Sequence, residues 1–419
     1  MGRKAVGKAM GKGNVAVVHG VHPGPITPHG GDGRDGSGLL FGSVLAVLLA
    51  TGWVANHFVG LIPVISAREH LGRSTLDAIF AIYAVGLLPG LIVGGRASDL
   101  LSRQSVAWAG SITSLAGTVA MLVSQHADVL LAGRLVVGAG VGLVISSCTA
   151  WASDMRGPAG AGIAGALLTT GFAVGPFVAG VVASAGQSGL WQSFVIAAVL
   201  IILATIAAVV AAYRVPVVTV ATRPRVEPVS ERRGIGQALS WALPLAPWVF
   251  SSVTLAFVTI PAHVHTGLAA PLAAGSAALI ANGVSGAIQL VARARRWGPR
   301  TGVVGAVLAA IGYSATAVAL PTMSLAVALP LQVILGCASG LLLREGLIDL
   351  EAAAPQRLRG ALTGAFYTVS YLGFGLPMLL STVGSARRDA IILAVLAVLA
   401  LAAAAGRAMR LQRDPHRRN

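Results

Sequence analysis

The chain has 419 residues, of which 55% are hydrophobic and only 11% charged, and its formal net charge is +16. Soluble domains contain about a quarter charged residues, so this composition excludes an ordinary soluble protein. The two cysteines, Cys148 and Cys337, are too few for a disulfide framework or a cysteine metal site, and we expect no metal and no cofactor.

The first segment, residues 1–37, contains no apolar run and is rich in Gly, Pro, His and Lys. Its basic residues are not followed by the apolar core of a secretory signal. We expect a disordered cytoplasmic tail, or translated leader sequence ahead of a later start.

Twelve apolar runs follow, each of roughly 20 residues, the length that crosses a hydrocarbon core of about 30 Å as a helix. Hydrocarbon offers backbone N–H and C=O groups no partners, so such runs must be helical. The first six spans are expected at 39–63, 76–97, 104–124, 128–149, 160–185 and 190–213. The other six are expected at 237–260, 268–291, 300–319, 322–343, 360–382 and 387–409. The sequence therefore predicts an all-α membrane protein with twelve transmembrane helices.

A polar stretch divides these spans into two sets of six. We expect an N-terminal bundle over 38–213, a cytoplasmic linker over 214–236, a C-terminal bundle over 237–410 and a basic cytoplasmic tail over 411–419. Small-residue pairs recur about 200 residues apart: Gly138 and Gly142 as Gly336 and Gly340, and Gly165-Ala166 as Gly364-Ala365. This weak repetition favours two six-helix pseudo-repeats, as transporters often show.

The basic residues predict the orientation. With the N-terminus inside, the tails, the linker and the loops between spans 2–3, 4–5, 8–9 and 10–11 hold nearly all Lys and Arg, and the outside keeps Arg68, Arg73, Arg387 and Arg388. Both termini are then cytoplasmic by the positive-inside rule. Since the positive charge is spread over loops and forms no single basic face, nucleic acid is not an expected partner. The expected partners are the lipid bilayer, protons and a small molecule, with the chain acting as a monomer.

The loop between spans two and three, residues 95–104, resembles the signature of the major facilitator superfamily. Gly95, Asp99 and Arg103 match that signature, whereas three positions depart from it: Leu100, Ser102 and Gln104. The resemblance implies a gate in which Asp99 faces the positive helix terminus at the cytoplasmic start of span eleven. The alternative is a simple loop ion pair, which contributes little at a surface. The corresponding loop 8–9, residues 293–300, is basic without an acid, and we assign it a topological role and interface contacts.

Span four carries an arginine inside the membrane. The segment from Arg134 to Gly140 is similar to the intramembrane arginine motif of the superfamily. Arg134 lies about six residues in from the external end, roughly 9 Å deep at about 1.5 Å per residue. A partner, a water-filled cavity or snorkelling to the interface must relieve the cost of burying this charge.

Span five looks like the motif of the twelve-helix drug:proton antiporter branch, through Gly171, Gly175, Pro176 and Gly180, with Ala179 replacing one glycine. Small residues allow close helix approach and Pro176 frees a backbone carbonyl, so we expect a kinked, tightly packed helix between the halves. A generic small-residue helix interface is the alternative. The three motifs, in order on the appropriate helices, imply the major facilitator fold over residues 39–410.

Proton coupling needs a group that gains and loses charge inside the membrane. We hypothesise that Asp77 and His57 form a proton-responsive cluster with Arg134 in the outer half of the N-terminal bundle. In the simpler alternative, Asp77 caps span two and His57 hydrogen-bonds within the bundle. Glu345 is a third candidate, although an inner salt-bridge set or a solvated helix end would also explain it.

A secondary transporter, and specifically a proton-driven exporter of amphipathic or drug-like molecules in a bacterial cytoplasmic membrane, is the function that these features favour. Trp53, Asn56 and Trp248 are candidates to line its cavity, although Trp is also an interface anchor. A sugar or polar-metabolite transporter and a non-transporting sensor on the same fold remain alternatives. We expect no enzyme, since no clustered catalytic set is present, and the lack of a Walker loop leaves the proton gradient as the energy source.

Overall fold

The computed structural model describes residues 32–214, 231–264, 266–320, 322–355 and 358–413. These residues form helices and turns, with one isolated bridge between Val264 and Met323 and no β-strand. Twelve helical segments in the described ranges are long and apolar enough to cross a membrane, which confirms the predicted fold class. The predicted tail over 1–37 and linker over 214–236 lie mostly outside the described residues.

The six spans of the N-terminal half are built from six helical elements. They are α1 (Asp32–Asn56), α2 (Phe58–Glu69), α3 (Arg73–Leu100), α4 (Arg103–Val123), α5 (Ala127–Ala183) and α6 (Gln187–Arg214). The first span comprises α1 and α2, and α5 contains spans four and five. The turn inside α5 is at Arg156 and Gly157, where Gly157 has a φ of 63° that only glycine adopts readily.

The C-terminal half also forms six spans, two of them in several pieces. Its elements are α7 (Glu231–Ala242), α8 (Ala246–Thr254), η1 (Leu255–Thr259), η2 (Ile260–His263), α9 (Ala270–Ala294), α10 (Thr301–Ala319), α11 (Leu325–Ala353), α12 (Arg359–Tyr371), η4 (Leu372–Gly375), α13 (Leu376–Val383) and α14 (Ala386–Arg413). Span seven runs from α7 to η2 and span eleven from α12 to α13. Helix α14 continues to Arg413, into the segment predicted as a tail.

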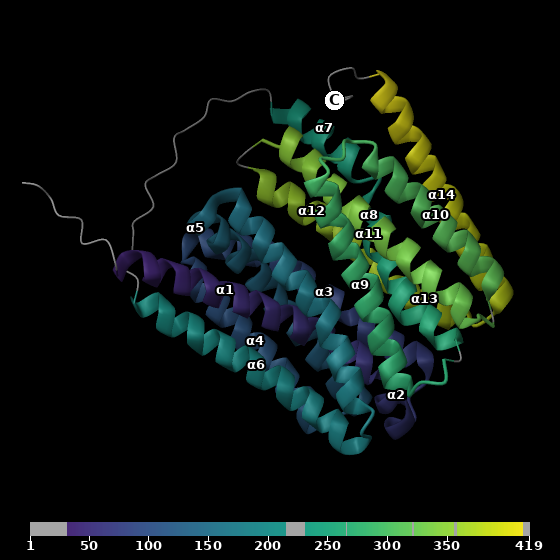
Figure 1. Ribbon diagram of the computed structural model, residues 1–419, viewed down its shortest axis with the longest axis horizontal. Coiled ribbons are helices and arrows are strands. Elements are labelled where there is room, and N and C mark those ends of the chain that lie inside the picture. Colours follow the sequence, from purple (N-terminus) through teal and green to yellow (C-terminus); the bar gives the residue numbers. More distant parts are fainter. Residues whose placement is uncertain (1–31, 215–230, 265, 321, 356–357, 414–419) are drawn as a thin grey trace, which may run out of the picture.

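Figure 1 shows the two halves as separate groups of helices, with α1 to α6 on one side and α7 to α14 on the other. Between them, α5 packs against α9, α2 against α9, and α3 against α12 and α13. The end of the molecule that carries Arg73 and Gly384 is called the outer end below, following the predicted topology, and the opposite end the inner end.

The halves approach most closely at the outer end. A Cβ atom added to Gly275 of α9 would overlap the backbone of Pro176, and one added to Gly180 would overlap the backbone of Pro271. Further along α9, a Cβ on Gly283 would meet no heavy atom within 4 Å, and one on Gly286 only a side-chain methyl group of α5. The backbone-to-backbone contacts of these glycines between α5 and α9 therefore lie at the outer end, and further inwards the contact of Gly286 is with a side chain.

Candidate functional site

The interface between the two halves is the candidate site because the broken helices meet there. Transporters place substrate sites where discontinuous helices line the boundary between repeats. Span seven changes from α-helix to a π-helical turn at Leu255–Thr259 and then to a 3₁₀ turn at Ile260–His263. Span eleven is broken by the 3₁₀ turn Leu372–Gly375, whose Gly373 packs directly on the backbone of Ser251 in span seven.

An aromatic cluster crosses this interface. We define it by seven residues from spans two, seven and eleven: Phe80, Tyr83, Phe250, Phe257, Tyr367, Tyr371 and Phe374. Phe80 of the N-terminal half stacks on Phe374 of the C-terminal half, with ring centroids 5.1 Å apart. Phe250 stacks on Tyr371 with centroids 4.3 Å apart. Only 5% of the chain is aromatic, so this concentration at one interface marks it as a surface suited to apolar and aromatic groups.

A polar group lies on the outer side of the cluster. Asp77, 3% exposed at the start of α3, has its carboxylate 3.8 Å from the guanidinium of Arg73. Ser381, in the other half, lies near this carboxylate, and its hydroxyl donates to the carbonyl of Met378 at 3.1 Å. Asp389 at the start of α14 lies in the electrostatic field of Arg73 and His263. Opposite charges therefore face one another across the boundary at the outer end.

Arg134 is fully buried in the N-terminal half, at 0% exposure. One of its nitrogens donates to the carbonyl of Ala55 at 2.8 Å, and the guanidinium lies 5.0 Å from the ring centre of Phe58 and 4.5 Å from that of Tyr83. Its Nε and Nη2 have no hydrogen-bond partner among the described residues. The side chain therefore does not snorkel, and its charge is held by aromatic faces and a carbonyl, with no carboxylate in the described set.

His57 lies beside Arg134 in the same core and is also fully buried. Its Nδ1 is 2.9 Å from the carbonyl of Val54, its Nε2 has no partner in the described residues, and its ring packs edge-on against Phe194. The structure thus brings His57 and Arg134 together. The charge that acts on Asp77 is instead Arg73, at the outer surface.

The span-five motif lies where spans one, five and eight meet. Gly171 and Gly175 pack on the backbone of α1 around Trp53, and the carbonyl of Pro176 faces both Gly60 and Gly275. Helical backbone angles continue through Pro176, since the non-helical residues of α5 are at the turn between its two spans.

The three cavity candidates have different surroundings. Trp53 is partly exposed, and its Nε1 has no partner among the described residues. The Asn56 amide donates to the carbonyl of Phe172 at 2.9 Å. Trp248 donates to the carbonyl of Pro244 inside the C-terminal bundle, where it contacts Tyr313.

The loop between spans two and three forms an ion-pair network within the N-terminal half. Arg103 binds Asp99 at 2.6 Å, Asp154 at 3.0 Å and the hydroxyl of Ser98 at 2.7 Å. Gly95 has open space beside it. Asp99 is 68% exposed. The side chains at 359–361, where the expected contact with span eleven would form, lie outside the described set, so the gating role stays a prediction.

Glu345 belongs to a buried network in the C-terminal half. Arg407 of α14 binds Glu345 at 3.0 Å and Asp349 at 2.6 Å, and the hydroxyl of Thr301 donates to Glu345 at 2.6 Å. Arg344 lies 3.3 Å from the same carboxylate. Both acids are 2% exposed, so this end of α11 is an ion-paired core element and not a solvated helix end.

Sequence reasoning missed several of these residues. Arg407 was not singled out, although an arginine inside an apolar run is the signal that identified Arg134. No local sequence pattern identified Ser381, Asp389 or most of the aromatic cluster, because their contacts join helices that are far apart in the chain. The two glycines and the proline of span eleven, Gly373, Gly375 and Pro377, are the signal that could have predicted its broken helix.

Among proteins of known function, the chain is 30% identical over 125 residues to the 3-(3-hydroxy-phenyl)propionate transporter of Escherichia coli, which is 29% of this chain and 30% of that protein. It is 29% identical over 106 residues to the multidrug resistance protein MdtL of Shigella flexneri, covering 25% and 27% of the two chains. The matching region thus spans less than a third of these curated relatives.

Solved structures share the fold over most of the chain. A peptide transporter POT in complex with sulfate superposes with a TM-score of 0.72 at 13% identity, covering 88% of this chain and 94% of that chain. A POT family transporter in complex with 5-aminolevulinic acid gives a TM-score of 0.72 at 11% identity, covering 90% and 96%.

The family model of the Major Facilitator Superfamily matches residues 39–378. This range covers most of the chain and includes the three motifs and both halves of the interface. The protein is therefore a multi-pass membrane transporter, not an enzyme, and it belongs to the Major Facilitator Superfamily.

Proposed function

We propose that this transporter exports small amphipathic molecules that carry an aromatic or extended apolar part, in exchange for protons. The observation that carries the proposal is the aromatic cluster, because both halves contribute rings to one interface. A flat or apolar ligand gains from such rings through offset stacking and the loss of water-exposed surface. The names of the two partial relatives, a phenylpropionate transporter and a multidrug resistance protein, agree with this class of substrate.

The mechanism that we propose is alternating access. The rings of Phe80, Phe257 and Phe374 are buried where the halves meet, with exposures of 0, 2 and 7%, and the glycine contacts through backbone atoms between α5 and α9 lie at the outer end. These features support a conformation that is open towards the cytoplasm, in a bacterial cytoplasmic membrane with both termini inside. Opening to the outside would separate Phe80 from Phe374, and a ligand held between the halves could take the place of one ring.

Asp77 is the group that we propose to couple protons to this movement. It is an acid at the boundary, it is nearly buried, and it lies close to Arg73 on one side of the boundary and to Ser381 on the other. Protonation would remove its charge and weaken its attraction to Arg73, which changes the balance between closed and open outer ends. His57 lies inside the N-terminal half, so it would sense the proton through Arg134 and not at the boundary.

The first test uses everted membrane vesicles that contain the protein, acidified inside and monitored with a fluorescent pH probe. Adding aromatic cations, neutral aromatics, aromatic acids and sugars in turn should release protons with aromatic compounds and not with sugars. Release with sugars alone would contradict the proposed substrate class. Silence with every compound would contradict proton-coupled export itself.

The second test compares Asp77→Asn with Asp128→Asn, an exposed acid in the first turn of α5. Loss of a charge that couples proton and substrate should abolish the proton signal of Asp77→Asn while the Asp128→Asn variant keeps it. Binding of the aromatic substrate to purified Asp77→Asn should persist. If proton release by Asp77→Asn equals that of the parent protein, Asp77 is not the coupling group.

A further inference from the structure

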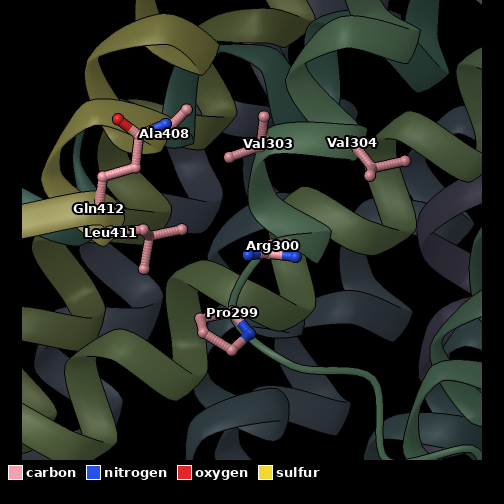
Figure 2. A pocket seen from close by; sticks show the side chains of 7 residues that line it. All are labelled: Pro299, Arg300, Val303, Val304, Ala408, Leu411 and Gln412. Carbon is pink, nitrogen blue, oxygen red and sulfur yellow. The ribbon is translucent and has the colours of Figure 1, made fainter. Parts of the chain in front are cut away.

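One groove in the described surface lies away from the interface, on the C-terminal half. It is a groove of about 310 Å³ between the first turn of α10 and the last turns of α14. Figure 2 shows Arg300 between Pro299 and the two valines of α10, with Ala408, Leu411 and Gln412 on the facing helix. Its walls are mainly aliphatic.

A second groove of about 320 Å³ lies on the other side of the same turn of α10. It shares Arg300 and Val304 with the first groove, and is otherwise lined by Trp297, Gly298, Thr301 and Leu341. Two apolar grooves therefore flank one arginine, Arg300. This arrangement matches a molecule with two hydrocarbon chains and one head group.

The helices around the grooves face the membrane. In α10, Val304 and Ile311 are each 48% exposed, and in α14 a row of large apolar side chains is exposed: Ile391, Val395, Val398, Leu399, Leu401 and Met409. Figure 1 shows α10 and α14 on the side of the C-terminal half that faces away from the N-terminal half. Apolar surface of this extent on a membrane-spanning helix contacts lipid chains, so lipid reaches both grooves from the side.

The charge beside the grooves is positive, and it is carried by arginines that are exposed to solvent and can bind an anionic ligand. The loop before α10 carries Arg293, Arg295, Arg296 and Arg300, all exposed, without an acid between them. None of the four makes an ion pair with a carboxylate in the described ranges, unlike Arg103 in the equivalent loop of the other half. Trp297 is 40% exposed, as expected for a side chain at the level of lipid head groups.

The loop backbone is held in place by the buried network. The carbonyl of Trp297 accepts a hydrogen bond from Arg344, that of Pro299 accepts one from Arg407, and Thr301 donates to Glu345. Arg300 therefore projects from a fixed segment, so that binding there costs little ordering of the backbone.

From these features we infer a binding site for an anionic diacyl phospholipid, such as phosphatidylglycerol. Its phosphate binds Arg300 with help from the neighbouring arginines, and its two acyl chains occupy the two grooves. Arginine suits phosphate because its guanidinium donates two parallel hydrogen bonds, and basic pockets between membrane helices bind anionic head groups. The inference does not depend on the substrate or on proton coupling.

The test measures lipid binding to the purified full-length protein in detergent by native mass spectrometry. Dioleoyl phosphatidylglycerol is titrated first, and dioleoyl phosphatidylcholine, with identical chains, serves as the zwitterionic comparison. Inorganic phosphate is added as a competitor. The variants are Arg300→Gln, which removes the charge, and Val304→Trp, which places a bulky side chain at the boundary of the two grooves without changing charge. Arg388→Gln, an exposed arginine in the first turn of α14 at the opposite end, is the matched control.

Phosphatidylglycerol should bind several-fold tighter than phosphatidylcholine, with no displacement by inorganic phosphate. Arg300→Gln should weaken phosphatidylglycerol binding about fivefold, the effect expected for one basic contact, while Arg388→Gln leaves it unchanged. Val304→Trp should also weaken it, and because its side chain faces lipid it should fold even if Arg300→Gln does not. Equal binding of both lipids, displacement by free phosphate, or unchanged affinity in both groove variants would each overturn the inference.

Discussion

Among the described residues, each half of this transporter buries one arginine in its helical bundle, and the two have opposite surroundings. Arg407, 5% exposed, is matched by two carboxylates, Glu345 and Asp349, within 3.0 Å. Arg134, 0% exposed, has a carbonyl, two aromatic faces and two nitrogens without partners in the described residues. A buried pair with full hydrogen bonding holds helices in register, whereas a buried charge without a counter-ion is expensive and persists when function requires it. We therefore expect Arg407 to contribute to stability, and we propose that Arg134 serves transport.

The largest effect on stability is expected for Arg407→Met. This change leaves two buried carboxylates without their partner, and breaking a buried ion pair in this way costs about 3–5 kcal/mol. The variant should unfold at a much lower temperature in detergent or fail to accumulate in the membrane, as measured by thermal unfolding monitored by size-exclusion chromatography. The triple variant Glu345→Gln, Asp349→Asn, Arg407→Met should recover part of the loss. A single variant as stable as the parent would show that the network is not structural.

Arg134→Met is expected to reduce transport without lowering stability. The substitution removes a buried charge that has no carboxylate partner, so the unfolding temperature should change little or rise. Transport, measured as proton release on adding an aromatic substrate, should fall at least tenfold, because the charge that faces His57 and Tyr83 is gone. If Arg134→Met unfolds as Arg407→Met does, the contrast between the two halves is wrong.

The smallest effect is expected for Asp99→Asn. Its partner Arg103 also binds Asp154, and Asp99 is largely exposed, so the ion pair contributes about 0–1 kcal/mol. The unfolding temperature should hardly move. The same kind of change at a buried acid of the other half, Asp349→Asn, should lower the unfolding temperature clearly. A loss of transport in Asp99→Asn at normal stability would favour the gating role over a simple loop pair.

The sequence predicted the number of spans and the fold class because a spanning helix is a local property of about 20 consecutive residues. It also singled out Arg134, since a charge inside an apolar run stands out without knowledge of its neighbours. The partners of these residues were harder to predict. Arg407 lies 62 residues from Glu345, and the stack of Phe80 on Phe374 joins opposite halves. Such pairs depend on which spans pack against one another, and a short stretch of sequence does not contain that information.

The glycine and proline contacts at the outer end bear on the speed of the alternating access that we propose. Gly275 meets Pro176, and Gly180 meets Pro271, through backbone atoms. Closing a contact between long side chains fixes rotamers and loses entropy, by up to about 2 kcal/mol for each side chain, whereas Gly and Pro have almost none to lose. Contacts of this kind form and separate without a search through side-chain conformations. We therefore expect the entropic barrier at the α5–α9 contact to be low both for closing and for opening.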